Sequence, residues 1–279
     1  IRVFIKREDL NHPTIQGNKY HKLKLNLEQA QQSKKQPLIT YGGAYSNHIA
    51  ATAQAAKALG LESIGIIRGE ELAHQPDKWS ETLLTATQNG MKLEFVSRQA
   101  YRQKNEPAEI NRLMTRYPNA YIIPEGGSNT LAVAGFESVT CDLEQQCPDW
   151  THLYTAVGTG GTLAGLVKHA SYQKNRSILG VAVLKQAEQL LPQITEWIGL
   201  GQKNKWQLLT EFHQGGYAKM PPHFLEFMHQ FEAEFKILLD PIYTAKMAFS
   251  FFKQLDAGHI PPGSTVILLH TGGLQGRQI

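Results

Sequence analysis

The chain has 279 residues, of which 42% are hydrophobic and 19% charged, as is typical of a soluble globular protein with a sizeable core. Its 28 basic and 24 acidic residues give a net charge of +4 and form no long basic block, which argues against a nucleic-acid partner. No apolar run reaches the roughly 18 residues of a membrane span, and no signal peptide is recognisable. We therefore expect a cytoplasmic protein with neither a nucleic-acid nor a membrane partner.

Short β-rich runs alternate with helix-length segments along the chain. In chain order, the predicted strands are 37–41, 63–68, 92–97, 120–124, 152–157, 178–183, 207–210 and 265–270, and helical segments between them include 47–59, 80–89 and 162–173. Most of the strand candidates are continuously apolar, as is typical of strands that are covered on both faces. The alternation predicts an α/β protein with parallel sheets and helices on both sides of them.

Four glycine-rich turns directly follow predicted strands. They are Gly42-Gly43, Gly126-Gly127, the turn at 158–161 and Gly272-Gly273. Any one of them is explained by a tight strand-to-helix turn. Ligands of open α/β sheets, however, bind beyond the carboxyl ends of strands, where glycine lets backbone amides approach them. Four such turns at the same end of their strands favour one shared crevice.

The turn at 158–162 carries the clearest chemical signal of the four. It consists of Gly158, Thr159, Gly160, Gly161 and Thr162. Backbone amides at a glycine-rich helix start, reinforced by the helix dipole, suit a phosphate dianion. Leu163 stands where the dinucleotide fingerprint needs glycine, and Leu166 where the nucleotide P-loop needs lysine. The turn therefore predicts a phosphate site without a nucleotide signature, and a plain tight turn is the alternative.

Two other segments carry reactive side chains that also have ordinary explanations. Lys19 lies in a basic cluster with Lys22, and such a cluster near a helix start is usually a solvated face. Ser46-Asn47-His48 stands at a predicted helix start, where serine and asparagine commonly cap the helix and histidine is commonly packed. Cys141 and Cys147 have neither a metal-binding nor a redox spacing, and no metal site is predicted.

Five separated motifs together resemble one family. In chain order they are Asn18-Lys19, Ser46-Asn47-His48, the turn at 158–162, Asp240-Pro241-Ile242-Tyr243 and His270-Thr271-Gly272-Gly273. In this order and spacing the chain resembles D-cysteine desulfhydrase and 1-aminocyclopropane-1-carboxylate deaminase, within the tryptophan synthase β-like (fold type II) pyridoxal-phosphate enzymes. The resemblance covers nearly the whole chain, from Lys6 to Gly273, and is weakest between about 184 and 212.

The resemblance implies a fold, a cofactor and an assembly. It implies two open, mostly parallel twisted sheets, with pyridoxal 5′-phosphate held in a cleft. We expect the smaller domain to be inserted at 37–136, with 1–36 and 137–279 forming the larger, cofactor-binding domain. The resemblance also implies a homodimer and a small amino-acid substrate.

The resemblance further implies which residues hold the cofactor. Lys19 matches the Schiff-base lysine, whose primary amine binds the cofactor aldehyde and later serves as a base. Lys22 matches a second lysine that helps to hold the phosphate, and the cradle around that phosphate matches Val157, Gly158, Thr159, Gly160, Gly161 and Thr162. Asn47 matches the asparagine that bonds the phenolic oxygen, and Thr271 the residue that faces the pyridine nitrogen.

Substrate-binding residues follow from the same resemblance. Ser46, Asn47 and His48 lie where the substrate carboxylate is expected. Tyr243 matches an active-site tyrosine, and Tyr217 matches a second one, for which a packed loop tyrosine is the alternative because the residues after it depart from the pattern. Of these residues, Ser46, Tyr217 and Tyr243 are also expected to take part in catalysis together with Lys19.

Two positions separate the activities known in the family. Ring-opening deaminases typically carry glutamate where Thr244 stands and leucine where Thr271 stands. The resemblance therefore favours β-elimination, with D-cysteine converted to pyruvate, sulfide and ammonium as the leading expectation. The alternatives are 1-aminocyclopropane-1-carboxylate deaminase, another amino-acid eliminase or dehydratase, and a non-catalytic pyridoxal-phosphate-binding protein. A nucleotide-binding α/β protein is disfavoured by the two phosphate fingerprints that fail.

Overall fold

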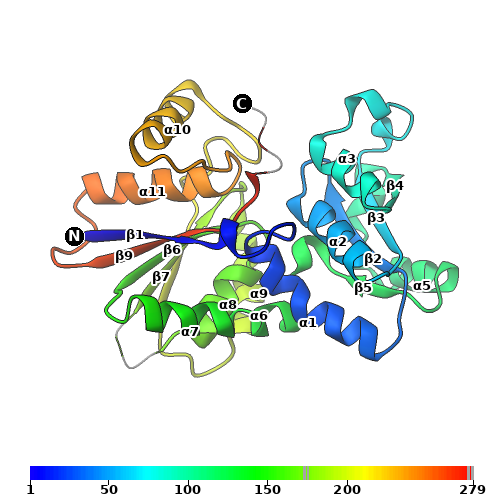
Figure 1. Ribbon diagram of the computed structural model, residues 1–279, viewed down its shortest axis with the longest axis horizontal. Coiled ribbons are helices and arrows are strands. Elements are labelled where there is room, and N and C mark those ends of the chain that lie inside the picture. The colour runs from blue at the N-terminus through cyan, green and yellow to red at the C-terminus, as the bar shows by residue number, and fades with distance from the viewer. Residues whose placement is uncertain (172–173, 175, 275–276, 278–279) are drawn as a thin grey trace. The chain divides into compact units, whose positions relative to one another are not determined.

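The computed structural model describes residues 1–171, 174, 176–274 and 277, and the chain divides into two compact units (Figure 1). Unit 1 comprises Ile1–Lys22 and Asn129–Ile279, and unit 2 comprises Leu23–Ser128. Among the described residues, no helix combines the length and the apolar character that crossing a membrane requires.

The unit boundaries differ from the predicted ones at 37 and 136. Helix α1 (Asn18–Gln32) is divided, because its later part contacts unit 2: the hydroxyl of Tyr121 donates to Oδ1 of Asn26 at 3.2 Å. At the other boundary, helix α6 (Thr130–Ala134) packs against α8 (Gly161–His169) of unit 1. Both boundaries are thus set by tertiary contacts and not by a break in the sequence pattern.

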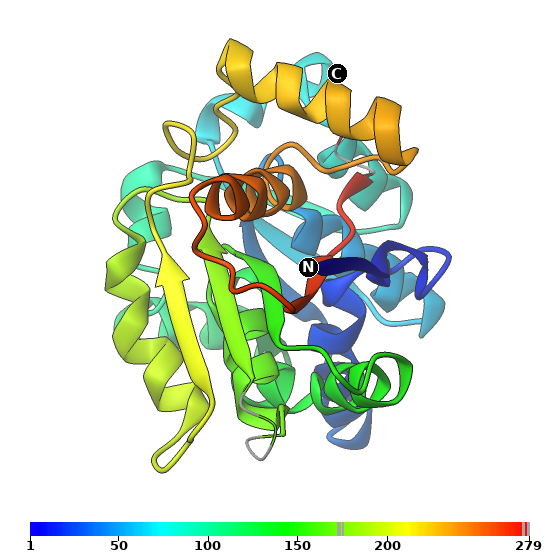
Figure 2. The same cartoon turned by 90° about the vertical axis from the view of Figure 1, so that its left-hand side faces the viewer.

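Unit 1 contains a five-stranded sheet in which every pair of neighbours is parallel, in the order β1-β9-β6-β7-β8. The strands are β1 (Arg2–Arg7), β6 (His152–Val157), β7 (Ser177–Ala182), β8 (Lys205–Leu209) and β9 (Thr265–His270). Helices α7 (Glu137–Gln146), α8 and α9 (Leu191–Ile198) cover one face, and α11 (Thr244–Asp256) covers the other, with α10 (Pro222–Phe235) outside it (Figure 2).

Strand β6 shows why these strands are continuously apolar. Leu153 and Val157 pack into the core that contains α7 and α8, whereas Tyr154 and Ala156 pack towards α11. Because successive side chains of a strand point to opposite faces, a strand covered on both sides is apolar at most positions instead of at every second one.

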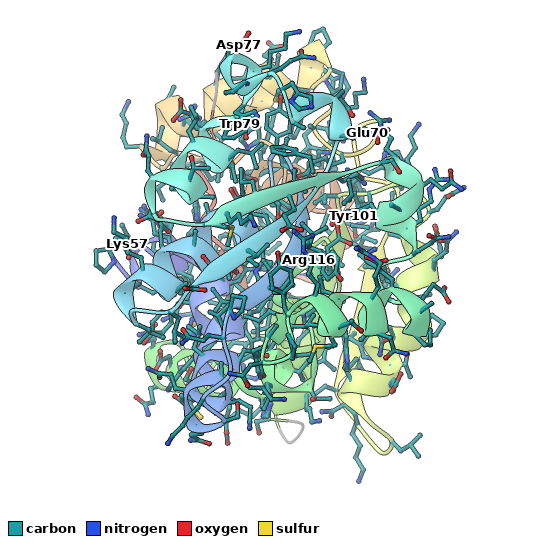
Figure 3. The ribbon with its side chains drawn as sticks, turned by 90° about the vertical axis from the view of Figure 1, so that its right-hand side faces the viewer. Lys57, Glu70, Asp77, Trp79, Tyr101 and Arg116 are labelled. Atoms are coloured by element: carbon teal, nitrogen blue, oxygen red, sulfur yellow. The ribbon has the colours of Figure 1, made fainter. Side chains whose placement is uncertain are left out.

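Unit 2 contains a four-stranded parallel sheet in the order β4-β3-β2-β5. Its elements are β2 (Leu38–Gly43), α2 (Asn47–Ala58), β3 (Ser63–Arg68), α3 (Glu81–Gln88), β4 (Lys92–Val96), α4 (Arg98–Arg102), α5 (Pro107–Arg116) and β5 (Tyr121–Ile123). Helices α2 and α3 pack on one face of the sheet, and α4 and α5 pack on the other. Arg116 and Tyr101, which Figure 3 labels, come from α5 and α4, and Arg116 bonds Glu94 of β4 at 2.9 Å.

The predicted elements largely match the observed ones. The strands predicted at 63–68, 152–157 and 265–270 have the bounds of β3, β6 and β9, and the other five differ from their strands only at the ends. The helix predicted at 162–173 ends earlier, because the backbone turns extended at Ala170 (ψ 144°); residues 172–173 lie outside the described part of the chain. Strand β1 was not predicted. It lies at a sheet edge with Val3 and Phe4 exposed, and therefore lacks the signature of a strand buried on both faces.

Candidate active site

The glycine turns meet in pairs, one pair in each unit. In unit 1, β6 and β9 are parallel neighbours, so the turns that follow them leave the same edge of the sheet. In unit 2, β2 and β5 are parallel neighbours, which brings Gly42-Gly43 and Gly126-Gly127 to one edge. Each sheet therefore presents two glycine turns at its carboxyl edge, and the single shared crevice stays a prediction.

The first residue of α1 joins the two turns of unit 1. The backbone amide of Asn18 donates to the carbonyl of Thr271 at 3.2 Å, after β9. Its side-chain Nδ2 donates to Oγ1 of Thr162 at 2.9 Å, in the turn after β6. These two bonds place Lys19, the next residue, between the segments that the sequence motifs singled out.

Gly17 allows this close approach. Its φ is +69°, and a Cβ on it would lie 1.9 Å from the carbonyl oxygen of Thr271. A side chain would therefore clash with backbone that has no room to move, besides being strained in the left-handed region. The glycine before Asn18-Lys19 is thus required by the contact between α1 and the turn after β9.

The amine of Lys19 is set up to lose its proton close to neutral pH. Its Nζ donates to Oδ1 of Asn18 at 2.9 Å and lies 6.0 Å from the centre of the Tyr243 ring. Burial lowers the pKa of Lys19 to about 8, although the negative charge of Asp240 opposes that shift. The neutral amine, which is the form that attacks an aldehyde, is therefore accessible.

The turn after β6 has the character of an anion site. Gly160 adopts a left-handed conformation (φ +88°) at the start of α8, and Nζ of the buried Lys22 lies 3.4 Å from Oγ1 of Thr159. Burial, and then the like charge of Lys19, lower the pKa of Lys22 well below its usual range. Helix-start amides beside two lysines favour a dianion, which would restore the lysine charge.

Of the two predicted tyrosines, Tyr243 lies beside this turn, and Tyr217 pairs with Tyr243. A Cβ on Gly158 would come within 3.2 Å of Cε1 of Tyr243, so the glycine lets the tyrosine ring lie over the turn. The rings of Tyr217 and Tyr243 form an edge-to-face pair with centres 6.2 Å apart. The structure thus brings Tyr217 to Tyr243; its catalytic role stays a prediction.

Val157 ends β6, and Thr271 directly follows β9, at the same edge of the sheet. Both are buried, and Val157 directly precedes the turn at 158–162. The backbone of Thr271 is already engaged by Asn18, which leaves its side chain as the part to face a ligand. The contact of Thr271 with a pyridine nitrogen stays a prediction.

The segment Ser46-Asn47-His48 belongs to unit 2. Ser46 occupies the N-cap of α2, but its hydroxyl makes no capping bond to the helix amides, so capping does not account for it. Oδ1 of Asn47 is buried and has no hydrogen-bond partner among the described residues, a cost that a ligand would relieve. His48 is buried and its Nε2 lies 2.7 Å from Oγ1 of Thr40, which gives it a packing role; its predicted contact with substrate stays untested.

Two functional groups were not assigned a role from the sequence. Asp240 was noted only as part of a motif, yet its buried Oδ1 accepts the amides of Ile242 (3.1 Å) and Tyr243 (2.6 Å). Burial raises the pKa of Asp240 to about 7. Lys246 was missed altogether, and the only signal was a lysine among the apolar residues of the stretch that forms α11.

The residues of unit 1 fit pyridoxal phosphate, since a buried lysine amine of lowered pKa lies in the same unit as a glycine turn with the character of an anion site. A model of the family described as "Pyridoxal-phosphate dependent enzyme" matches residues 1–272. The chain belongs to this family. Its cofactor is therefore pyridoxal phosphate, as the resemblance implied.

Named relatives confirm the resemblance inferred from the motifs. A protein of Pyrococcus abyssi named "Putative 1-aminocyclopropane-1-carboxylate deaminase" is 30% identical, over 99% of this chain and 86% of its own. The mitochondrial bifunctional D-cysteine desulfhydrase/1-aminocyclopropane-1-carboxylate deaminase of Arabidopsis thaliana is 27% identical, over 98% of this chain and 73% of its own.

Solved structures confirm the fold class. A crystal structure of an ACC deaminase homologue superposes with a TM-score of 0.83 at 27% identity, covering 98% of this chain and 85% of the other. Maize serine racemase superposes with a TM-score of 0.68 at 15% identity, covering 99% of this chain and 84% of the other, and shows the shared fold alone. The pyridoxal-phosphate dependent enzyme thus has the predicted two-sheet, fold type II architecture.

Proposed function

We propose that this enzyme catalyses β-elimination on a small amino acid, with D-cysteine converted to pyruvate, sulfide and ammonium. The observation that carries the proposal is the Lys19 amine. Burial lowers its pKa to about 8, it lies 6.0 Å from the centre of the Tyr243 ring, and its neighbour Asn18 bonds Thr162 of the turn that we propose to hold the phosphate. When bound, pyridoxal phosphate draws electrons from Cα of an amino acid and so makes the Cα proton removable. The protein groups around the cofactor hold it, orient the substrate and take up the Cα proton.

The residues that match the family's cofactor contacts each have a part in this proposal. Lys19 binds the cofactor covalently, and Lys22 with the turn at 157–162 neutralises its phosphate. Asn47 is proposed to contact the cofactor's phenolic oxygen, on the strength of the family resemblance; the buried Oδ1 of this side chain has no hydrogen-bond partner among the described residues. Thr271 would offer its hydroxyl to the pyridine nitrogen. A hydroxyl, unlike a carboxylate, does not keep that nitrogen protonated.

Proton transfer falls to Lys19 once the substrate has released it. Its Nζ is poised near neutral pH and takes the Cα proton, since a base works best when its pKa lies near the working pH. The Tyr243 ring, 6.0 Å from the amine, pairs with that of Tyr217, and we propose that the two rings cover the amine and limit access of water. Ser46 and His48 are proposed to bind the substrate carboxylate, on the strength of the family resemblance.

Thr244 supports elimination over ring opening. Its side chain is fully buried, and its Oγ1 accepts the Asp240 amide at 2.7 Å and donates to the Asp240 carbonyl at 3.2 Å. Where the ring-opening deaminases carry a glutamate, this chain therefore has a hydroxyl that is occupied by the backbone. It provides no carboxylate for the proton transfers of ring opening.

Ring opening of 1-aminocyclopropane-1-carboxylate is the second candidate activity. It is favoured by the names of the relatives from Pyrococcus abyssi and Arabidopsis thaliana. A different amino-acid eliminase or dehydratase would share every described feature except those that choose the substrate.

A substrate panel with purified holoenzyme tests the proposal. D-cysteine, L-cysteine, D-serine and 1-aminocyclopropane-1-carboxylate are supplied in turn, and keto acid, sulfide and ammonium are measured, with Lys19→Ala as the control. We expect D-cysteine to give the highest kcat/KM with equal amounts of sulfide and pyruvate, and Lys19→Ala to lose at least about 10³-fold.

The other outcomes are distinct. A four-carbon keto acid from the cyclopropane substrate, at higher kcat/KM than D-cysteine, would establish the second candidate. Lysine-bound cofactor absorbance without turnover of any amino acid would indicate a binding protein. Absence of that absorbance in the wild type, after incubation with pyridoxal phosphate, would refute the assignment of Lys19.

A further inference from the structure

Lys246 lies inside α11 with no exposed surface, although lysine is rarely buried. Its Nζ donates to the carbonyl oxygen of Gly216 at 2.7 Å. Burial lowers the pKa of Lys246 to about 8, and the negative charge of Asp240 opposes this shift. An ammonium group that is kept in such a place needs its acceptor, because an unpaired buried charge is costly.

The acceptor belongs to a turn that depends on it. Gly216 has φ +117°, a conformation that other residues rarely adopt, and its amide donates to the carbonyl of His213 at 3.0 Å. Its carbonyl accepts both Lys246 Nζ and the amide of Lys219 (3.2 Å), so this one oxygen anchors the turn to α11. The next residue is Tyr217.

Asp240 plays the matching part for the other tyrosine. Its Oδ1 accepts the backbone amide of Tyr243 at 2.6 Å, at the start of α11. Buried Asp240 therefore holds the backbone of Tyr243, and buried Lys246 holds the backbone of Gly216, the residue before Tyr217. These two side chains carry opposite charges that attract each other.

We propose that Lys246 is a positioning residue, which with Asp240 holds Tyr217 and Tyr243 in their edge-to-face arrangement at the site. The inference rests on the proposed function, in which these two rings cover the reacting amine. Lys246 itself does not reach the substrate, since its ammonium is bonded to backbone beneath the turn. Its effect is to fix where the Tyr217 ring stands.

The experiment compares four holoenzymes: wild type, Lys246→Met, Lys246→Gln and Lys253→Met. Methionine keeps much of the volume and removes both charge and donor, whereas glutamine keeps a neutral donor. Lys253, an exposed lysine of the same helix, is the matched control. Amide hydrogen exchange is followed over residues 213–219, together with the visible cofactor spectrum, KM and kcat.

In Lys246→Met we expect exchange across 213–219 to become at least roughly tenfold faster, with the cofactor spectrum retained. KM should rise roughly tenfold and by more than kcat falls, because the misplaced ring weakens substrate binding first. Lys246→Gln should recover part of both effects, and Lys253→Met should match the wild type.

Two results would overturn the proposal. One is wild-type exchange at 213–219 and wild-type KM in Lys246→Met. The other is faster exchange throughout unit 1 with a lowered melting temperature, which marks a merely structural lysine. If the methionine variant does not fold, the same measurements on Lys246→Gln decide between the two roles. Should the wild type turn over no amino acid, the proposed function fails, while the exchange data still decide whether Lys246 holds the turn.

Discussion

At the scale of single residues, Lys19 shows how burial converts an ordinary side chain into a reactive one. Lysine is protonated at neutral pH in water, but desolvation lowers the pKa of this one to about 8. A lowered lysine pKa means that the neutral form, the nucleophile, gains population as pH rises. At pH 7 roughly a tenth of the amine is neutral, and well above pH 8 nearly all of it is.

This predicts how fast the apoenzyme takes up its cofactor. The rate constant for formation of lysine-bound pyridoxal phosphate, followed by visible absorbance, should increase between about pH 6.5 and 9 and level off above that range. Lys24→Ala, at an exposed position on the same helix, should give the same profile. A rate that keeps rising up to about pH 10 would show that the Lys19 pKa is not lowered.

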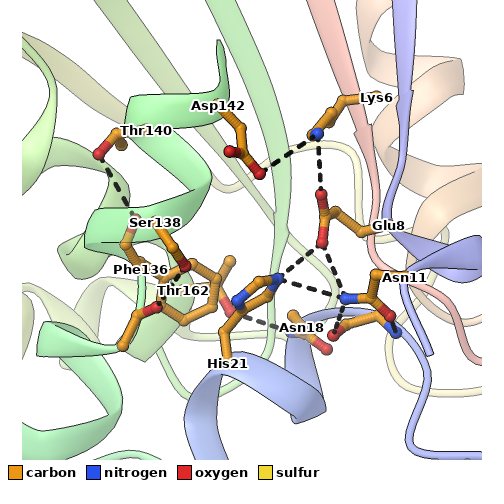
Figure 4. Close-up of polar contacts among 12 residues, drawn as sticks. Lys6, Glu8, Asn11, Asn18, His21, Phe136, Ser138, Thr140, Asp142 and Thr162 are labelled. Atoms are coloured by element: carbon orange, nitrogen blue, oxygen red, sulfur yellow. Dashed lines mark hydrogen bonds and ion pairs between the residues drawn. The ribbon is translucent and has the colours of Figure 1, made fainter. Parts of the chain in front are cut away.

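At the scale of elements, a buried carboxylate ties the start of the chain to α1 (Figure 4). Glu8 follows β1, and its carboxylate lies 2.6 Å from Nε2 of His21, 2.8 Å from Nδ2 of Asn11 and 3.3 Å from Nζ of Lys6. Asn11 in turn accepts the amide of Gly17 at 3.0 Å. This network fixes the segment that leads into Lys19.

The network predicts a pH-dependent stability. Burial raises the pKa of Glu8, but the hydrogen bond and charge of His21 and the charge of Lys6 outweigh it, so that the pKa is lowered overall. A carboxyl group whose pKa is lowered by folding stabilises the folded state at pH values above its ordinary pKa. This stabilisation is lost as the pH falls through the folded-state pKa. Glu8→Gln should therefore cost about 1–3 kcal/mol at pH 7 and flatten the loss of stability below about pH 5.

Urea unfolding at a series of pH values measures both effects. Glu28→Gln, which removes an exposed carboxylate from α1, is the control and should follow the wild type. A Glu8→Gln protein with the wild-type unfolding midpoint and the wild-type pH dependence would show that the network does not stabilise the fold.

At the scale of the whole molecule, the assembly is still a prediction from family resemblance. A homodimer should sediment as a single species with twice the chain mass of 31.2 kDa, independent of concentration at micromolar levels. Sedimentation equilibrium with and without pyridoxal phosphate measures this. A stable species of one chain mass under both conditions would contradict the dimer.

The sequence by itself determined the local features of this protein. Continuous apolar runs identified most of the strands that are covered on both faces, because such strands favour apolar residues on each face. The order of five motifs, through the family resemblance that it carries, implied the cofactor that the family match confirms and predicted Lys19 as its lysine.

Only the tertiary structure decided which residues act on one another from a distance. Edge strand β1, the division of α1 between the units, the Glu8–His21 contact and the bond from Lys246 to Gly216 all depend on segments that lie far apart in the chain. Burial sets the pKa of Lys19 and Asp240, and burial is a property of the packed molecule. A sequence pattern shows which groups are present; the packing that surrounds them decides their charge and their partners.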